Sequence, residues 1–107
     1  MKRGDLVTVA LQGDYGKPRP GLIVQSDLMD ELESVVLCPI TSDLRDAAAF
    51  RVTLEPTPMN GLRNLSQVMT DKLSTVPKAK VGEPFGRLDD KKMQDVERAI
   101  LLVLGIA

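Results

Sequence analysis

The chain has 107 residues, of which 43% are hydrophobic and 27% are charged, a composition typical of one folded domain over residues 1–107. Fourteen Lys and Arg residues stand against fifteen Asp and Glu residues, and the resulting net charge of −1 creates no overall positive field for nucleic acid. No histidine is present, which excludes Ser-His-Asp and Cys-His catalysis and His-ligated zinc, so we expect neither a metal nor another cofactor.

The first part of the chain predicts short strands. Residues 7–11 alternate apolar with polar or small side chains, which is typical of a half-buried strand. Glycines and prolines between 13 and 20 predict a loop, and residues 21–25 then form an apolar strand. Ser26 is a suitable cap for a short helical turn over residues 28–32.

Three further strands are predicted in the middle of the chain. They cover residues 35–40, 50–55 and 66–70, and residues 72–76 could continue the last of them. The single Cys38 lies inside the first of these apolar runs, so we interpret it as a small buried side chain and not as a nucleophile.

The C-terminal segment predicts a helix capped by Asp89 and ended by Gly105. Its apolar stripe consists of Met93, Val96, Ile100, Val103 and Leu104. Leu101 and Leu102 widen that stripe, so the helix either packs deeply or contributes to a dimer interface. Short strands followed by one helix indicate a mainly β fold, a small, curled antiparallel sheet or partial barrel.

The expected location is cytoplasmic. No apolar run approaches the ~18 residues that span a membrane. The chain begins Met1-Lys2-Arg3-Gly4-Asp5, which reaches an acidic residue without the apolar region of a secretion signal.

Positive charge gathers between Gly61 and Arg87. This stretch holds Arg63, Lys72, Lys78, Lys80 and Arg87 against only Asp71 and Glu83. Such a bias suits a phosphate-binding face, and a solvated surface is the other interpretation.

Four segments together resemble the MazF/PemK toxins, the metal-independent mRNA endoribonucleases of type II toxin–antitoxin systems. They are Arg3-Gly4-Asp5-Leu6-Val7, residues 16–27 (GKPRPGLIVQSD), Cys38-Pro39-Ile40-Thr41-Ser42, and residues 60–72 with Asn60-Gly61-Leu62 and Ser66-Gln67-Val68-Met69-Thr70-Asp71-Lys72. The resemblance covers nearly the whole chain, in order and at suitable spacings. One departure is the loop over residues 12–20, which is shorter than in many relatives and in the family helps to shape the RNA groove.

The resemblance implies an SH3-like antiparallel barrel with a C-terminal helix, as in MazF and CcdB toxins. It further implies a homodimer, a single-stranded RNA substrate cut by attack of the 2′-hydroxyl, and a cognate antitoxin protein as partner. No membrane association is expected.

The same resemblance implies which residues act. Arg19 matches a catalytic arginine, and its guanidinium is a permanent, forked donor suited to a phosphate. Thr41 is the second catalytic candidate, because its hydroxyl can donate a hydrogen bond to the same phosphate. By the chemistry of their side chains, the remaining candidates for RNA contact are Lys17, Ser42, Gln67 and Lys72. For Lys17, Gln67 and Lys72, a solvated strand or loop residue is the other interpretation. The general base stays open, because a guanidinium does not give up its proton near neutral pH.

Two other functions fit the same pattern. A CcdB-like gyrase poison shares the fold class and acts through the end of its C-terminal helix, and this chain ends Leu104-Gly105-Ile106-Ala107 without the tryptophan of those toxins. A barrel that only binds a partner is the second alternative. Retention of Arg19 and Thr41 in their expected contexts favours the nuclease.

Overall fold

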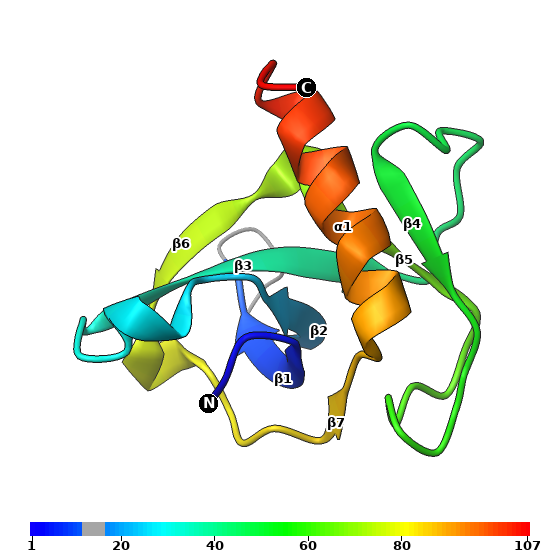
Figure 1. The fold of residues 1–107 in the computed structure, drawn as a ribbon. Coiled ribbons are helices and arrows are strands. Elements are labelled where there is room, and N and C mark those ends of the chain that lie inside the picture. Colours follow the sequence, from blue (N-terminus) through cyan, green and yellow to red (C-terminus); the bar gives the residue numbers. More distant parts are fainter. Residues whose placement is uncertain (12–16) are drawn as a thin grey trace.

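The computed structural model describes residues 1–11 and 17–107. Within this part of the chain, seven strands, three short 3₁₀ turns and one α-helix follow one another (Figure 1). They are β1 (Asp5–Ala10), β2 (Pro18–Ile23), η1 (Asp27–Met29), β3 (Ser34–Thr41), β4 (Arg51–Leu54), β5 (Ser66–Met69), η2 (Thr70–Lys72), β6 (Ser74–Pro77), η3 (Lys78–Lys80), β7 (Gly86–Arg87) and α1 (Asp90–Val103). The predicted fold class, mainly β with a C-terminal helix, is confirmed.

All strand pairs are antiparallel, and β3 is the strand around which the sheet curls. The order is β4-β5-β3-β2-β1-β7, with β6 also paired to β3. β3 pairs with β6 along its first half and with β5 at its last two residues, while β2 lies on its other edge. The turn between β4 and β5 approaches β7 at the far edge, where the Arg87 N–H donates to the Met59 carbonyl at 2.8 Å. This contact brings the two ends of the sheet together.

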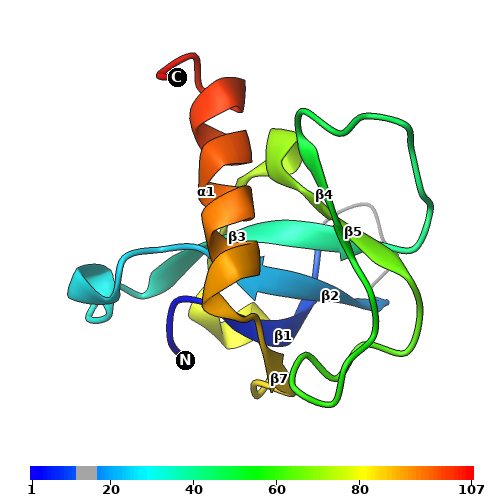
Figure 2. The same ribbon diagram turned by 45° about the vertical axis from the view of Figure 1, so that its right-hand side comes forward.

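The sheet is buried on both faces along β1, β2 and β3. Successive residues of β3 belong to different apolar clusters: Leu37 packs in one, and Cys38 and Ile40 pack in the other. The second cluster lies under α1, which contributes Met93, Val96 and Ala99 to it. Figure 2 shows α1 lying across this face of the curled sheet.

Both predicted ends of α1 are confirmed. The Asp89 carboxylate accepts the Lys92 N–H at 2.8 Å, and Gly105 adopts the left-handed φ of +74° that ends the helix. Met93 and Val96 of the predicted apolar stripe are buried, whereas Val103 and Leu104 are 38% and 53% exposed, so the end of the stripe does not pack on the sheet. The last turn of the helix extends past the strands on which its first turns pack (Figures 1 and 2).

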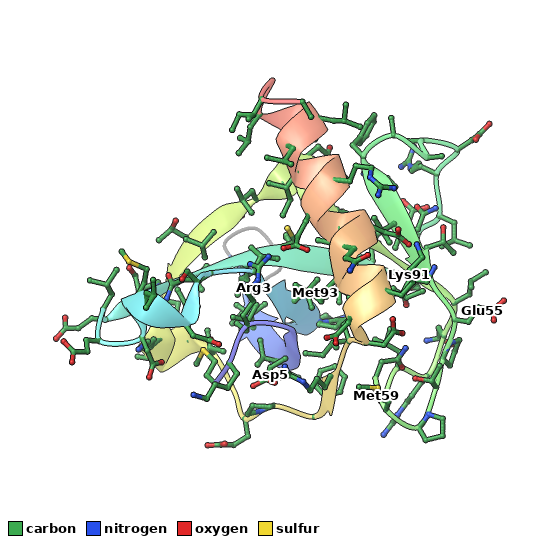
Figure 3. The ribbon with its side chains drawn as sticks, viewed as in Figure 1. Arg3, Asp5, Glu55, Met59, Lys91 and Met93 are labelled. Carbon is green, nitrogen blue, oxygen red and sulfur yellow. The ribbon has the colours of Figure 1, made fainter. Side chains whose placement is uncertain are left out.

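Arg3 joins the N-terminal segment to this helix. Its guanidinium donates to the Val24 carbonyl and to the Glu97 carboxylate of α1, the latter at 2.8 Å. Figure 3 places Arg3 beside α1, on the side where Met93 and Asp5 also lie. The side chain thereby helps to fix the helix against β1 and β2.

Two predicted boundaries are wrong, and one strand was not predicted. β2 begins at Pro18, not after residue 20, because both prolines lie where β2 pairs only with β1. The 3₁₀ turn η2 separates β5 from residues 74–77, which form a strand of their own on β3. The short strand β7 carried no alternation from which to predict it. Residues 12–16 of the predicted loop lie outside the described residues.

No helix in residues 1–11 and 17–107 is long and apolar enough to cross a membrane.

Candidate functional site

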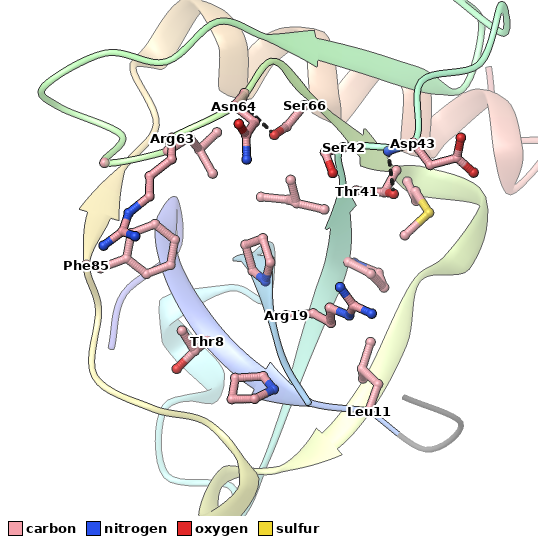
Figure 4. Close-up of a pocket in the computed structure, with 17 residues that line it drawn as sticks. Thr8, Leu11, Arg19, Thr41, Ser42, Asp43, Arg63, Asn64, Ser66 and Phe85 are labelled. Carbon is pink, nitrogen blue, oxygen red and sulfur yellow. Dashed lines mark hydrogen bonds between the residues drawn. The ribbon is translucent and has the colours of Figure 1, made fainter. Parts of the chain in front are cut away.

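A cleft of about 880 Å³ opens at one end of the curled sheet (Figure 4). The ends of β2 and β3 form one side of it, and the segment before β5 together with Phe85 forms the other. Its lining residues are Thr8, Leu11, Pro18, Arg19, Pro20, Pro39, Ile40, Thr41, Ser42, Asp43, Gly61, Leu62, Arg63, Asn64, Ser66, Met69 and Phe85.

Strand register brings the two predicted catalytic residues to this cleft. The ladder between β2 and β3 ends at the pair Gly21↔Pro39. Counting two residues further along each strand sets Arg19 and Thr41 at corresponding positions, and both line the cleft. Figure 4 shows the two side chains on the same side of it.

A local hydrogen bond orients the Thr41 hydroxyl. Thr41 Oγ1 accepts the Asp43 N–H at 3.0 Å, which is drawn as a dashed line in Figure 4. A hydroxyl that accepts through a lone pair still has its own proton to donate. Thr41 is therefore placed as a hydrogen-bond donor toward a ligand in the cleft, and Ser42 lines the cleft beside it.

The charged side chains of the cleft favour an anion. Among the residues that the structure describes, Arg19, Arg63 and one carboxylate, that of Asp43, line it. That carboxylate is already paired with Arg45, whose Nη2 lies 3.0 Å from Oδ2. Both arginines are planar, forked donors of the kind that binds phosphate. In the part of the chain that the structure describes, no group of three or more His, Cys, Asp or Glu side chains could hold a metal ion.

A buried asparagine holds the segment that carries Arg63. Asn60 is 5% exposed, its Oδ1 accepts the N–H groups of Thr57 and Leu62, and its Nδ2 donates to the Glu55 carbonyl at 2.9 Å. These bonds satisfy the buried amide and fix the turn. The chain leaves this turn at residue 61 and runs along the cleft.

The turn packs tightly against the segment before β7. A Cβ on Gly61 would lie 2.7 Å from the Phe85 carbonyl oxygen, and a Cβ on Gly86 would lie 2.0 Å from the Asn60 carbonyl oxygen. Two backbone segments far apart in the sequence therefore touch at positions where only glycine fits. Sequence reasoning did not select Phe85, and a Pro-Phe-Gly sequence gave no signal that the ring would reach the cleft.

Three of the predicted RNA-contact residues lie outside the cleft lining. Lys17 is exposed and directly precedes β2, next to the lining residue Pro18. Lys72 is exposed at the end of η2. Gln67 is 7% exposed, and its amide bonds to both backbone groups of Arg45, at 2.9 and 3.0 Å. These bonds give the Gln67 side chain a structural role in holding the segment after β3.

The positive residues between Gly61 and Arg87 do not all line the cleft. Arg63 lines the cleft, whereas Lys78 pairs with Asp30 and Arg87 pairs with Asp5.

The structure agrees with a packing role for Cys38. The side chain is fully buried, and this burial raises the pKa of the thiol to about 12, with a smaller contribution from the negative charge of Asp71. A thiol that stays protonated at neutral pH is a poor nucleophile.

The fold and the cleft define a small curled β-sheet whose mouth is lined by two arginines, and similarity to known proteins identifies its family. The family described as PemK-like, MazF-like toxin of type II toxin-antitoxin system matches residues 2–104. A probable endoribonuclease MazF of Mycolicibacterium smegmatis is 45% identical over 108 residues, which cover 100% of this chain and 99% of that relative. This chain belongs to the PemK-like, MazF-like toxins of type II toxin–antitoxin systems.

Solved structures share the fold of this chain. The Mycobacterium tuberculosis toxin MazF-mt6 has a TM-score of 0.83 and 26% identity, and the match covers 96% of this chain and 98% of that one. An endoribonuclease in complex with its cognate antitoxin, from a mycobacterial species, also has a TM-score of 0.83, at 23% identity over 100% and 97% of the two chains. The family membership favours the nuclease over the CcdB-like gyrase poison.

Proposed function

We propose that this chain, an endoribonuclease toxin of the MazF-like family, cuts single-stranded RNA in the Arg19–Thr41 cleft by attack of a ribose 2′-hydroxyl on the neighbouring phosphodiester. The observation that carries this proposal is the convergence of Arg19 and Thr41 on one cleft whose charge favours a phosphate. On this proposal, residues 1–107 act as one domain in the cytoplasm, where mRNA is available.

The reaction forms one bond and breaks one. The 2′-hydroxyl loses its proton as its oxygen attacks phosphorus, the bond from phosphorus to the 5′-oxygen breaks, and the 5′-oxygen takes up a proton. The products are a 2′,3′-cyclic phosphate and a 5′-hydroxyl. Negative charge grows on the phosphoryl oxygens as the transition state forms. Arg19 stabilises that charge, and the Thr41 hydroxyl donates a hydrogen bond to the same phosphate. Ser42 and Lys17 contribute donors along the adjoining backbone of the RNA.

Incubation of the purified protein with a mixed-sequence single-stranded RNA in EDTA tests this function. Cleavage that leaves a 2′,3′-cyclic phosphate on the 5′ fragment supports it. A strict requirement for a divalent metal would contradict it. Oligonucleotides of the sequences that are cut are then synthesised with 2′-deoxyribose at the scissile nucleotide. These must resist cleavage because the attacking hydroxyl is gone.

The same assay separates the nuclease from a barrel that only binds. A binding module would shift RNA in a gel without shortening it, and Arg19→Ala would then change affinity alone. For the nuclease we expect Arg19→Ala to lose cleavage while retaining part of its affinity for uncleaved RNA.

We further propose that a cognate antitoxin covers the cleft. Family membership in type II systems supports such a partner. A flexible segment with acidic side chains suits Arg19 and Arg63 and would compete with RNA for them. Co-expression with the neighbouring reading frame tests this: the product must bind the toxin and relieve growth arrest, and failure of both would refute the assignment.

The last part of the proposal is a homodimer. The end of α1 and the residues that follow it expose five apolar side chains, each at least 38% exposed: Leu101, Leu102, Val103, Leu104 and Ile106. Such a surface is typical of an interface, and symmetric pairing is the commonest way to cover it.

A further inference from the structure

Phe85 and Arg63 lie on the side of the cleft opposite Arg19 and Thr41 (Figure 4). The Phe85 ring is 39% exposed although it lines a concave surface. Aromatic side chains are scarce in this chain, with two phenylalanines, one tyrosine and no tryptophan. An aromatic ring left partly open inside an anion-binding cleft calls for a ligand with an apolar face.

The backbone around the ring is held in place. The Phe85 N–H donates to the Leu6 carbonyl of β1 at 2.9 Å, and the ring itself lies against Gly61, where an added Cβ would meet its Cδ1 at 3.1 Å. Asn60 anchors the turn on the other side of that contact. The ring and the turn are thus ordered before any ligand arrives, and this lowers the entropic cost of binding.

Arg63 supplies charge on the same side. Its side chain is exposed and extends in Figure 4 toward Phe85. Over residues 1–11 and 17–107, Arg63 takes part in no ion pair, in contrast to Arg3, Arg45, Arg51 and Arg87. A guanidinium without a carboxylate partner, next to an open aromatic ring, matches the two halves of a nucleotide: a flat base and a phosphate.

We propose that Phe85 and Arg63 bind a nucleotide of the RNA next to the scissile phosphate, with its base stacked on the Phe85 ring and its phosphate bound by Arg63. This inference rests on the proposed ribonuclease function. Single-stranded RNA presents unstacked bases, and aromatic rings and arginines are the side chains that bind them. The scissile phosphate lies at Arg19 and Thr41, and the neighbouring nucleotide reaches across the cleft.

Binding is measured by fluorescence anisotropy with a cleavable oligonucleotide whose scissile nucleotide is 2′-deoxy, so that it binds without being cut. Phe85→Leu keeps an apolar side chain but removes the stacking surface, and we expect about 5- to 150-fold weaker binding, the range for loss of one base–aromatic stack. Phe85→Trp retains a stacking surface and should keep the affinity. Phe50→Leu is the matched control, because Phe50 is 36% exposed and does not line the cleft.

Arg63 is tested by salt dependence. Arg63→Gln removes one phosphate contact. The slope of the logarithm of the association constant against the logarithm of the salt concentration should therefore fall in magnitude by about 0.7, the value for one contact on a single strand. Phe85→Leu should leave that slope unchanged. A normal slope for Arg63→Gln would refute its phosphate role.

An abasic scan locates the stacked base. Wild-type protein should lose affinity when one nucleotide beside the scissile position lacks its base. Phe85→Leu should lose nothing further at that same position, while other positions remain as in the wild type. Additive losses at every position would overturn the proposal, as would Phe85→Leu binding within twofold of wild type with an unchanged melting temperature.

The outcomes separate this inference from the function on which it rests. If wild-type protein neither cuts nor binds RNA, the ribonuclease proposal fails. If wild-type protein cuts RNA and Arg19→Ala does not, while Phe85→Leu and Arg63→Gln behave as wild type, only the nucleotide site fails.

Discussion

Arg19 and Thr41 stand at corresponding positions two residues beyond Gly21↔Pro39, the last pair of the β2–β3 ladder. Just after β2, the Val24 N–H donates to the Val36 carbonyl of β3. The even-numbered residues of β2 therefore also turn their N–H positions toward β3. Pro18 and Pro20 lie on that same edge and have no N–H to donate. The prolines therefore stop the ladder, and the cleft opens where it stops. The residues that flank Arg19 in the sequence help to make the site that it occupies.

Arg19→Ala should lower the rate of RNA cleavage by about 10²–10³, the loss typical of one preorganised donor to a developing negative charge. Single-turnover cleavage in EDTA measures it. Arg98→Ala removes the same charge from an exposed position on α1, outside the cleft lining, and should stay within about twofold of wild type. Full activity in Arg19→Ala would remove Arg19 from the site, and an equal loss in both variants would indicate a general effect of charge.

Thr41→Val keeps the shape of the side chain and removes its hydroxyl. We expect the cleavage rate to fall about 10- to 150-fold, corresponding to loss of one hydrogen bond to a charged group. Thr41→Ser retains the donor and should recover most of the rate. If Thr41→Val cut at the wild-type rate while Thr41→Ser was slow, the methyl group and not the hydroxyl would be what matters, and the donor role would be wrong.

Much of this fold follows from local patterns. The alternation in β1, the Ser26 cap of η1 and the Asp89 cap of α1 are visible in the sequence because each depends on near neighbours. The start of β2 was missed because Pro18 and Pro20 indicate a loop until the pairing with β1 is known.

The site residues also divide into those that the sequence predicts and those that depend on contacts distant in the sequence. Arg19 and Thr41 were identified through resemblance to a family, and the structure places both on one cleft. Phe85 was missed because its position depends on a contact with Gly61, which is distant in the sequence. The polar amide of Gln67 predicts an RNA contact from the sequence, but strand pairing with Thr41 and the bonds to Arg45 turn that amide inward.

Gly61→Ala should destabilise the protein more than Gly105→Ala. Both glycines have a left-handed φ, +69° and +74°, at which an L side chain costs about 1–2 kcal/mol. Only at Gly61 would the new Cβ also meet the Phe85 backbone, which adds about 1–3 kcal/mol of overpacking, whereas nothing lies within 4 Å of Gly105. Thermal unfolding of both variants measures the difference, and equal melting temperatures would show that the Gly61–Phe85 contact is not tight in solution.

Cys38 should resist thiol reagents in the folded protein and react on unfolding, because burial raises the pKa of its thiol to about 12. An unfolded thiol ionises near pH ~8.5, so between these two values the unfolded chain holds fewer protons than the folded one. Stability from this group is therefore fully present below pH ~8.5 and falls as pH rises above it, by up to about 1.4 kcal/mol per pH unit.

Denaturant unfolding of wild type and Cys38→Ala between pH 7 and 10 checks this dependence on pH. The variant is less stable at neutral pH because it leaves a cavity, but its free energy of unfolding should fall less steeply above pH ~8.5. Parallel pH profiles for the two proteins would contradict the prediction.

The end of α1 should pair two copies of the chain. Leu102 is 48% exposed and Leu104 is 53% exposed, on a turn that extends past the sheet. Leu104→Glu would place a charge in an apolar interface, so we expect the dimer to weaken by about 30-fold or more, as for an interface hot spot.

Leu32→Glu is the control, because Leu32 is 46% exposed but lies just after η1, away from the helix end. Sedimentation over a range of micromolar concentrations measures both dimer equilibria. A monomeric wild type would refute the homodimer, and a dimer broken by Leu32→Glu but not by Leu104→Glu would place the interface at the η1 surface instead of on α1.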